Sequence, residues 1–130
     1  KKGQWMNPQN MVKGIDKLKN TNPDCSVWVT ERGSAFGYSQ FVVDFSSVDF
    51  MKEHFDKVIF DTTHSAQLPK PNGRMGGNPT LAARYFKATD IFNYDGVFAE
   101  AHPNPPLSYS DADSVLPLEE MVDLLKDEIK

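Results

Sequence analysis

The sequence has 130 residues, of which 39% are hydrophobic and 25% charged, and its formal net charge is -4 at pH 7. This length predicts one globular domain, and the negative charge argues against nucleic-acid binding, which needs a basic surface. No apolar run reaches the roughly 20 residues that cross a bilayer, and the single cysteine, Cys25, cannot form an internal disulfide, so we expect a cytoplasmic protein without a membrane partner.

The first half of the sequence predicts helices that alternate with apolar strands. Asn7 and Pro8 suit an N-cap and a first helical residue, and apolar residues at helical spacing continue this helix to about Asn20. The elements expected after it are a strand at 27–31, a short extended run at 41–45, a helix capped by Ser47, and a strand at 57–61.

The second half predicts a long loop, two helices and one more strand. Proline and glycine are frequent at 65–79, which predicts a βα loop without regular structure. We expect this loop to form a mobile lid, the alternative being a phosphate cradle made by its glycines. A helix is expected from Leu81 to Thr89 and a strand at 96–100. The last helix should begin near Pro117 and bury one apolar face, made of Leu118, Met121, Val122, Leu125 and Ile129.

The strands are continuous apolar runs separated by helices, which is typical of a parallel sheet covered on both faces. An open doubly wound sheet and a (β/α)8 barrel both have this pattern. No Gly-x-Gly-x-x-Gly turn joins a strand to a helix, which argues against the nucleotide-binding form of the open sheet. Barrel enzymes build their sites at the carboxyl ends of their strands. Charged or metal-binding residues follow every expected strand here, namely Lys1 and Lys2, Glu31 and Arg32, Asp61 and His64, and Glu100 and His102.

The number of expected elements is about half that of a complete barrel, which takes about 250 residues. We therefore expect residues 1–130 to be the carboxyl-terminal half, about four βα units, of a single (β/α)8 barrel catalytic domain. The amino-terminal half would lie outside this sequence, which begins KKGQW without a methionine.

Motifs along the whole sequence occur in the order found in a known family. They are KKGQ at 1–4, ERGSAFGY at 31–38, VVDF at 42–45, FDTTHSAQLP at 60–69, DGVFAEAHPNP at 95–105 and SDAD at 110–113. Together they closely resemble the carboxyl half of the 3-deoxy-D-manno-octulosonate 8-phosphate synthases (2-dehydro-3-deoxyphosphooctonate aldolases). The related DAHP synthases, in the same superfamily, are similar at the strand-end lysine, the E-R-G and the E-x-H-P, and less similar around SAQLP and AFGY.

The resemblance implies a transferase that condenses phosphoenolpyruvate with D-arabinose 5-phosphate. The products would be phosphate and 3-deoxy-D-manno-octulosonate 8-phosphate, a precursor of lipopolysaccharide. The resemblance also implies a homo-oligomer, which in that family is a tetramer. Two alternatives stay open: a DAHP synthase that uses erythrose 4-phosphate, and a barrel fragment that binds metal or phosphate without turnover.

The resemblance also implies substrate contacts and catalytic roles for particular residues. The implied catalytic residues are Lys1, Arg32 and His64, and the implied substrate-binding residues are Lys1, Gln4, Arg32, Phe36 and Gln67. The chemistry of Arg32 and Lys1 agrees, because a guanidinium can hold an oxyanion through two parallel hydrogen bonds and an ammonium is a compact positive charge. The alternative for Arg32 is a surface ion pair with Glu31. Lys2, on the opposite side of its strand from Lys1, is expected to be structural.

His64, Glu100 and Asp111 each follow a different expected strand and offer an imidazole and two carboxylates. Such donors suit manganese, iron or zinc, although a lone histidine is more often a hydrogen-bonding residue and an aspartate in a turn is more often a turn former. In the resembled family these three positions are ligands in the metal-dependent members. Metal-independent members often keep them and have asparagine in place of an amino-terminal cysteine, a position outside this sequence. We therefore expect a divalent-metal site here, and a structural role for His102.

Overall fold

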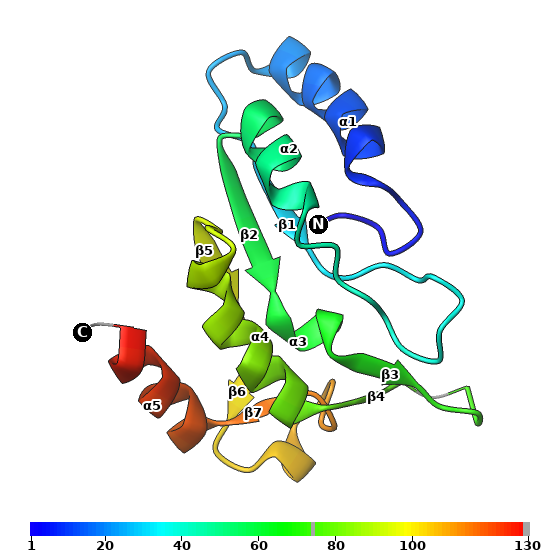
Figure 1. Ribbon diagram of the computed structural model, residues 1–130, viewed down its shortest axis with the longest axis vertical. Helices are drawn as coiled ribbons and strands as arrows, with labels where there is room; N and C mark the ends of the chain where they lie inside the picture. Colours follow the sequence, from blue (N-terminus) through cyan, green and yellow to red (C-terminus); the bar gives the residue numbers. More distant parts are fainter. Residues whose placement is uncertain (74, 129–130) are drawn as a thin grey trace.

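A three-stranded parallel sheet lies at the centre of the computed structural model, which describes residues 1–73 and 75–128 (Figure 1). Its strands are β1 (Trp28–Glu31), β2 (Lys57–Asp61) and β5 (Gly96–Phe98), in the order β1–β2–β5. The backbone N–H of Lys2 donates to the carbonyl of Thr30 at 2.8 Å, so the first residues follow the outer edge of β1. The predicted parallel α/β sheet is confirmed.

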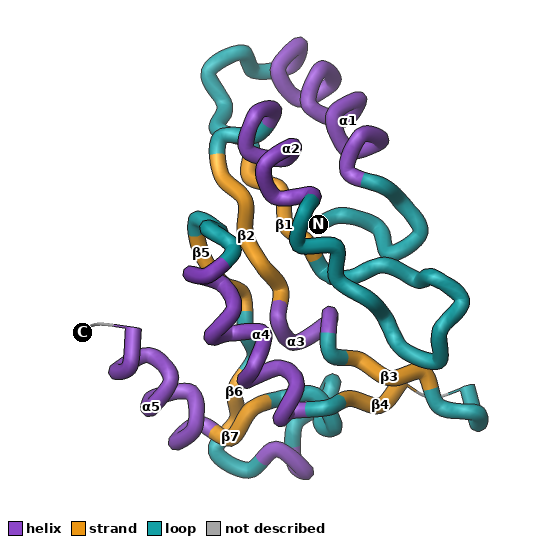
Figure 2. Tube along the Cα trace, in the orientation of Figure 1, coloured by secondary structure: helices purple, strands orange, loops and turns teal. Residues whose placement is uncertain are grey.

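The helices alternate with these strands, as the sequence predicts (Figure 2). Helix α1 (Pro8–Thr21) contacts α2 (Ser47–His54) near one end of the molecule, and α4 (Pro79–Ile91) contacts α5 (Leu118–Glu128) near the other. Two short helices are α3 (Thr62–Ser65) and the 3-10 helix η1 (Pro105–Leu107). None of the described helices combines the length and the apolar character needed to cross a membrane.

Two shorter strand pairs lie beyond the main sheet. Strands β3 (Gln67–Pro69) and β4 (Met75–Gly77) form an antiparallel pair, and β6 (Ala101–His102) and β7 (Leu116–Pro117) form a parallel pair. Within residues 1–73 and 75–128 these sheets stay separate and do not close into a barrel.

The core consists of two apolar clusters, one under each helix pair. The first packs α2 against β1 and β2 through buried side chains that include Val29, Val48, Met51, Val58 and Phe60. The second packs α4, α5 and β7 together and consists of Ala66, Ala82, Phe86, Leu116 and Leu124. The sheet is therefore anchored on both sides of β2, the strand that leads into His64.

The extended run expected at 41–45 forms an isolated bridge between Val42 and Ser34. Two expectations about local structure are wrong. The segment 65–79 contains regular structure, because β3 and β4 pair within it, and its role as a mobile lid stays a prediction. The cap of α2 is Ser46, whereas the Ser47 hydroxyl donates to the carbonyl of Asp44 at 2.7 Å. Each outcome depends on a contact with another segment or on one local hydrogen bond, which side-chain periodicity does not contain.

The buried face of α5 also differs from the expected one. Leu124 is buried and packs in the α4 cluster with Met121 beside it, whereas Leu118, Val122 and Leu125 are exposed. The helix has apolar residues on more than one face, so the packing against α4 decides which face is covered. Ile129, also expected on that face, lies outside the described residues.

Candidate active site

The carboxyl ends of the parallel strands meet at one edge of the sheet. Glu31 pairs in register with Phe60, and Asp61 pairs with Phe98, so the residues that follow β1, β2 and β5 lie level with one another. Lys1 reaches the same edge, where its Nζ lies 2.8 Å from Asp61 Oδ2 and 3.7 Å from the centre of the Phe98 ring. The predicted gathering of charged groups at the strand ends is therefore present.

Asp61 ends β2 and places His64 at this edge. Its side chain caps α3 by accepting from the backbone N–H of His64 at 2.9 Å. The same carboxylate lies 2.9 and 3.0 Å from Nδ1 of the His64 ring, whose side chain is 15% exposed. A single aspartate thus fixes both the backbone and the ring of His64.

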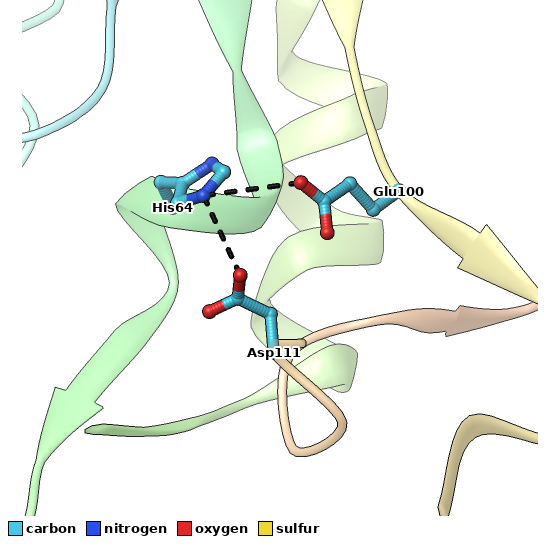
Figure 3. A group of neighbouring side chains, drawn as sticks. All are labelled: His64, Glu100 and Asp111. Carbon is cyan, nitrogen blue, oxygen red and sulfur yellow. Dashed lines mark ion pairs between the residues drawn. The ribbon is translucent and has the colours of Figure 1, made fainter. Parts of the chain in front are cut away.

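Glu100 and Asp111 face the opposite nitrogen of that ring (Figure 3). His64 Nε2 lies 3.9 Å from Glu100 Oε1 and 3.8 Å from Asp111 Oδ2, and the three donor atoms lie within 4.8 Å of one another. Donors that share an ion about 2.1 Å away lie roughly 3–4 Å apart, so these donors fit a divalent cation after small movements. The structure brings together all three residues predicted as ligands.

Neighbouring groups hold the two carboxylates in place. The backbone N–H of Glu100 donates to Thr63 Oγ1 at 2.8 Å, which ties the β5 end to α3. Asp111 has φ 51°, an uncommon backbone conformation for a residue with a side chain, and its carbonyl accepts from the N–H of Ser114 at 2.7 Å. Gln67, predicted to bind substrate, donates through Nε2 to Asp111 Oδ1 at 2.6 Å and so orients that carboxylate.

The pKa of Asp61 is lowered by its surroundings. Burial alone would raise this pKa, but hydrogen bonds from His64 and Lys1 outweigh that effect. Asp61 therefore remains an anion and can only accept hydrogen bonds from these two residues.

Arg32 lies one residue beyond β1 and is partly buried. Its Nε is inaccessible to solvent and has no hydrogen-bond partner within residues 1–73 and 75–128. Leaving such a donor unpaired costs about 1–3 kcal/mol, so this nitrogen lacks a partner that the described residues do not provide. The alternative ion pair with Glu31 is wrong, because Glu31 Oε1 instead lies 3.4 Å from Lys2 Nζ, with both residues buried.

Gln4 and Phe36, also predicted to bind substrate, lie beside a different hollow. Gln4 Nε2 donates to the carbonyl of Arg32 at 3.2 Å, whereas the Phe36 side chain is mostly exposed. Both line a cleft of about 590 Å³ whose lining does not include Lys1, Arg32 or His64. The structure therefore does not bring these two residues to the ligand cluster of His64.

Two residues expected to be structural have clear structural contacts. Lys2 Nζ donates to the carbonyl of Gly33 at 3.0 Å and to the hydroxyl of Ser34 at 2.9 Å. His102 Nδ1 accepts from the backbone N–H of Asn104 at 2.9 Å inside the HPNP turn.

The sequence placed Asp61 among the charged strand-end residues without a specific role and gave Thr63 none, although both are fully buried at the site. The spacing Asp-x-x-His directly after a strand was the available signal, because an aspartate N-cap faces the third residue of its helix. Thr63 offered no such signal, since its partner Glu100 is far away in the sequence.

Comparison with known proteins gives a consistent result along the chain. Residues 1–129 match the model of the DAHP synthetase I family. Proteins named 2-dehydro-3-deoxyphosphooctonate aldolase are similar to it, with 39% identity to that of Xylella fastidiosa (strain M12) over 97% of this chain and 46% of the relative. The identity is 38% for the protein of Helicobacter pylori (strain Shi470), over 100% of this chain and 51% of the relative. The identity to the protein of Delftia acidovorans is 39%, over 97% of this chain and 46% of the relative. The chain spans about half the length of these curated relatives.

Proposed function

The chain belongs to the DAHP synthetase I family, and on that premise we propose that it forms the carboxyl half of an enzyme that condenses phosphoenolpyruvate with D-arabinose 5-phosphate. The products are 3-deoxy-D-manno-octulosonate 8-phosphate and phosphate. One observation carries this proposal: the same sheet edge has two cationic residues, Lys1 and Arg32, and a set of metal-donor side chains. The cations suit an anionic substrate, and the donors suit a divalent metal. The relatives are named 2-dehydro-3-deoxyphosphooctonate aldolase, and this name favours the eight-carbon product.

The proposed fold is a (β/α)8 barrel in which β1, β2 and β5 are consecutive strands. Their parallel register, the intervening helices and the strand-end position of the polar residues support it. Residues 1–130 would form one half of a single catalytic domain. We also propose that the full-length protein is a cytoplasmic homo-oligomer and that its product is a precursor of lipopolysaccharide.

Arg32 and Lys1 are proposed to bind phosphoenolpyruvate, which carries a phosphate and a carboxylate on a small frame. The unpaired Nε of Arg32 supports an oxyanion contact, and Lys1 brings a second positive charge to the same edge. Preorganised charges of this kind stabilise the negative charge that moves during reaction. Their first role is therefore to hold the enol carbon toward the sugar aldehyde.

The proposed reaction forms one carbon–carbon bond and replaces the carbon–oxygen bond to phosphate with a bond to the oxygen of water. The methylene carbon of phosphoenolpyruvate attacks the aldehyde carbon of the sugar, whose oxygen takes up a proton. Water adds to the carbon that carries the phosphate ester, and the resulting hemiketal phosphate releases inorganic phosphate to leave a ketone. Arg32 and Lys1 balance the charge of the phosphate as it departs.

His64, Glu100 and Asp111 would hold a divalent metal through Nε2 and one oxygen of each carboxylate. Manganese, iron or zinc suits these donors, and the ion would orient the aldehyde or lower the pKa of the attacking water. Gln67 keeps Asp111 directed at this position whether or not the ion is required.

The experiment that tests the function measures phosphate release by the full-length protein with phosphoenolpyruvate and either acceptor. We expect release with arabinose 5-phosphate and little with erythrose 4-phosphate. Turnover with erythrose 4-phosphate alone would show that the protein is a DAHP synthase. If neither acceptor gives turnover and the protein still binds phosphate or metal, it is a binding protein without catalytic activity. Lys1→Met should lower the rate of phosphate release, because it removes one of the two cations proposed to bind phosphoenolpyruvate. Lys126→Met is its matched control, because Lys126 is an exposed lysine on α5 and its loss should not affect the rate.

A further inference from the structure

We propose that Asp61 is a positioning residue that fixes the proton of His64 on Nδ1 and so keeps Nε2 open as a ligand atom facing Glu100 and Asp111. This inference rests on the metal site of the proposed function. It adds Asp61, whose side chain contacts His64 and Lys1, to the residues that shape the proposed metal site.

The contacts of the imidazole require this assignment. Nδ1 lies 2.9 Å from one Asp61 oxygen and 3.0 Å from the other, and a carboxylate can only accept, so the proton lies on Nδ1. Nε2 then has its lone pair free, and it is the nitrogen that lies 3.9 and 3.8 Å from the oxygens of Glu100 and Asp111. Metal-binding histidines commonly have such a carboxylate on the second nitrogen.

Asp61 is itself held in a fixed orientation. It is completely buried, caps α3 through the backbone N–H of His64, and accepts from Lys1 Nζ at 2.8 Å. These contacts occupy both carboxylate oxygens, so the side chain cannot turn away from the ring without losing a charged hydrogen bond.

The other two histidines provide internal references for the tautomer of His64. His54 Nδ1 lies 2.9 Å from the carbonyl of Phe50, which can only accept, so it also carries a proton on Nδ1. His102 Nδ1 accepts from the N–H of Asn104, so its proton lies on Nε2 when the ring is neutral. One spectrum therefore contains both tautomers in known positions.

The test is a long-range proton–nitrogen NMR spectrum of the metal-free, full-length protein at about pH 8.5, above the ordinary pKa of an imidazole. We expect His64 to match His54 and to differ from His102. In Asp61→Asn the oxygen that caps α3, which also lies 3.0 Å from Nδ1, is retained. An N–H₂ group replaces Oδ2, the oxygen that lies 2.9 Å from Nδ1 and 2.8 Å from Lys1 Nζ, so a donor takes the place of one acceptor and His64 should shift toward the His102 tautomer. Finding His64 with its proton on Nε2 in the unmodified protein would overturn the inference, whatever the variant does.

Metal affinity gives the second readout, by calorimetric titration with Mn²⁺ alone. Asp61→Asn should weaken binding about 10- to 100-fold. The matched control is Asp95→Asn, because Asp95 accepts from Val58 N–H at the other end of β2 and should leave both the tautomer and the affinity unchanged. Unchanged affinity in Asp61→Asn, or an equal loss in Asp95→Asn, contradicts a positioning role. His64→Ala separates the two proposals: if it binds Mn²⁺ normally, the metal site is wrong, whereas the tautomer result still tests Asp61.

Discussion

At the scale of single residues, the buried pair of Lys2 and Glu31 supports the site from behind. Their charged atoms lie 3.4 Å apart and each residue is 1% exposed. Lys2 also donates to the Gly33 carbonyl and the Ser34 hydroxyl, which follow Arg32 directly. The pair therefore fixes the turn that carries Arg32.

Removing the charge of Lys2 should destabilise the fold strongly. Lys2→Met leaves the Glu31 carboxylate buried without its partner, which typically costs about 3–5 kcal/mol of unfolding free energy. Urea unfolding followed by circular dichroism measures this cost. Lys126→Met is the control, because Lys126 and Asp123 form an exposed pair at 3.2 Å, and such pairs contribute at most about 1 kcal/mol. Equal losses of unfolding free energy in the two variants would show that the buried pair contributes no more to stability than an exposed pair.

The same glutamate predicts a pH dependence of stability. Burial raises the pKa of Glu31 above its ordinary value of 4.5, although Lys2 and the Gly33 N–H act against this. The folded state then binds a proton that the unfolded state has already released, so this contribution is full below pH 4.5 and is lost as pH rises through the raised pKa. Unfolding free energies measured across that interval should fall with pH, and the fall should be absent in Glu31→Gln. A slope that persists in the variant would contradict this origin.

The positions of His64 and Glu100 after apolar strands marked them as site residues, whereas the resemblance to a known family was needed to name these two and Asp111 as ligands. The structure places the three donor atoms together. Asp61 was named as a charged strand-end residue, but its role was not predicted, because only the three-dimensional contact shows its carboxylate on the imidazole ring.

At the scale of elements, the β3–β4 hairpin forms the support of the Asp111 loop. Gly77 in β4 packs directly on that loop, where an added Cβ would overlap the Ser114 hydroxyl and come within 2.6 Å of the Asp113 carbonyl. Gln67 in β3 donates to Asp111 from the same hairpin. The hairpin and the 111–114 loop therefore pack as one unit.

This close packing predicts the effect of a single methyl group. Gly77→Ala should destabilise the protein by about 1–3 kcal/mol, as overpacking of a filled site commonly does, and should weaken metal binding by displacing Asp111. Ser114→Gly in the same chain should restore part of the loss, because it removes the hydroxyl that the new methyl group meets. Thermal unfolding of both single variants and the double variant measures the coupling. Strictly additive effects would mean that the two positions do not touch.

Helices and parallel strands were predictable because their apolar spacing is local. The pairings β3–β4 and β6–β7 were not, because these strands have only two or three residues each, which is too short for a periodic apolar pattern. The segment 65–79 reads as irregular from its proline and glycine content, whereas its glycine at 77 serves close packing against the 111–114 loop.

At the scale of the whole molecule, the surface is consistent with half of a larger domain. Large apolar side chains are exposed on several elements, with Trp28 at 61%, Ile91 at 76% and Leu107 at 70%. Soluble domains rarely leave extended apolar surface and open sheet edges uncovered. The relatives are about twice as long as this chain. In the proposed barrel, strands from that additional length would pair with the open edge formed by β1 and the first residues.

The central claim is that the strand ends form one site for a metal and phosphoenolpyruvate together. The most direct measurement is a crystal structure of the full-length protein with Mn²⁺ and phosphoenolpyruvate, using the anomalous signal of manganese. We predict one peak about 2.0–2.2 Å from His64 Nε2 and an oxygen each of Glu100 and Asp111, with the substrate phosphate or carboxylate on Arg32 Nε and Lys1 Nζ. Phosphoenolpyruvate bound away from Arg32 and Lys1, or manganese bound away from His64, would contradict the account.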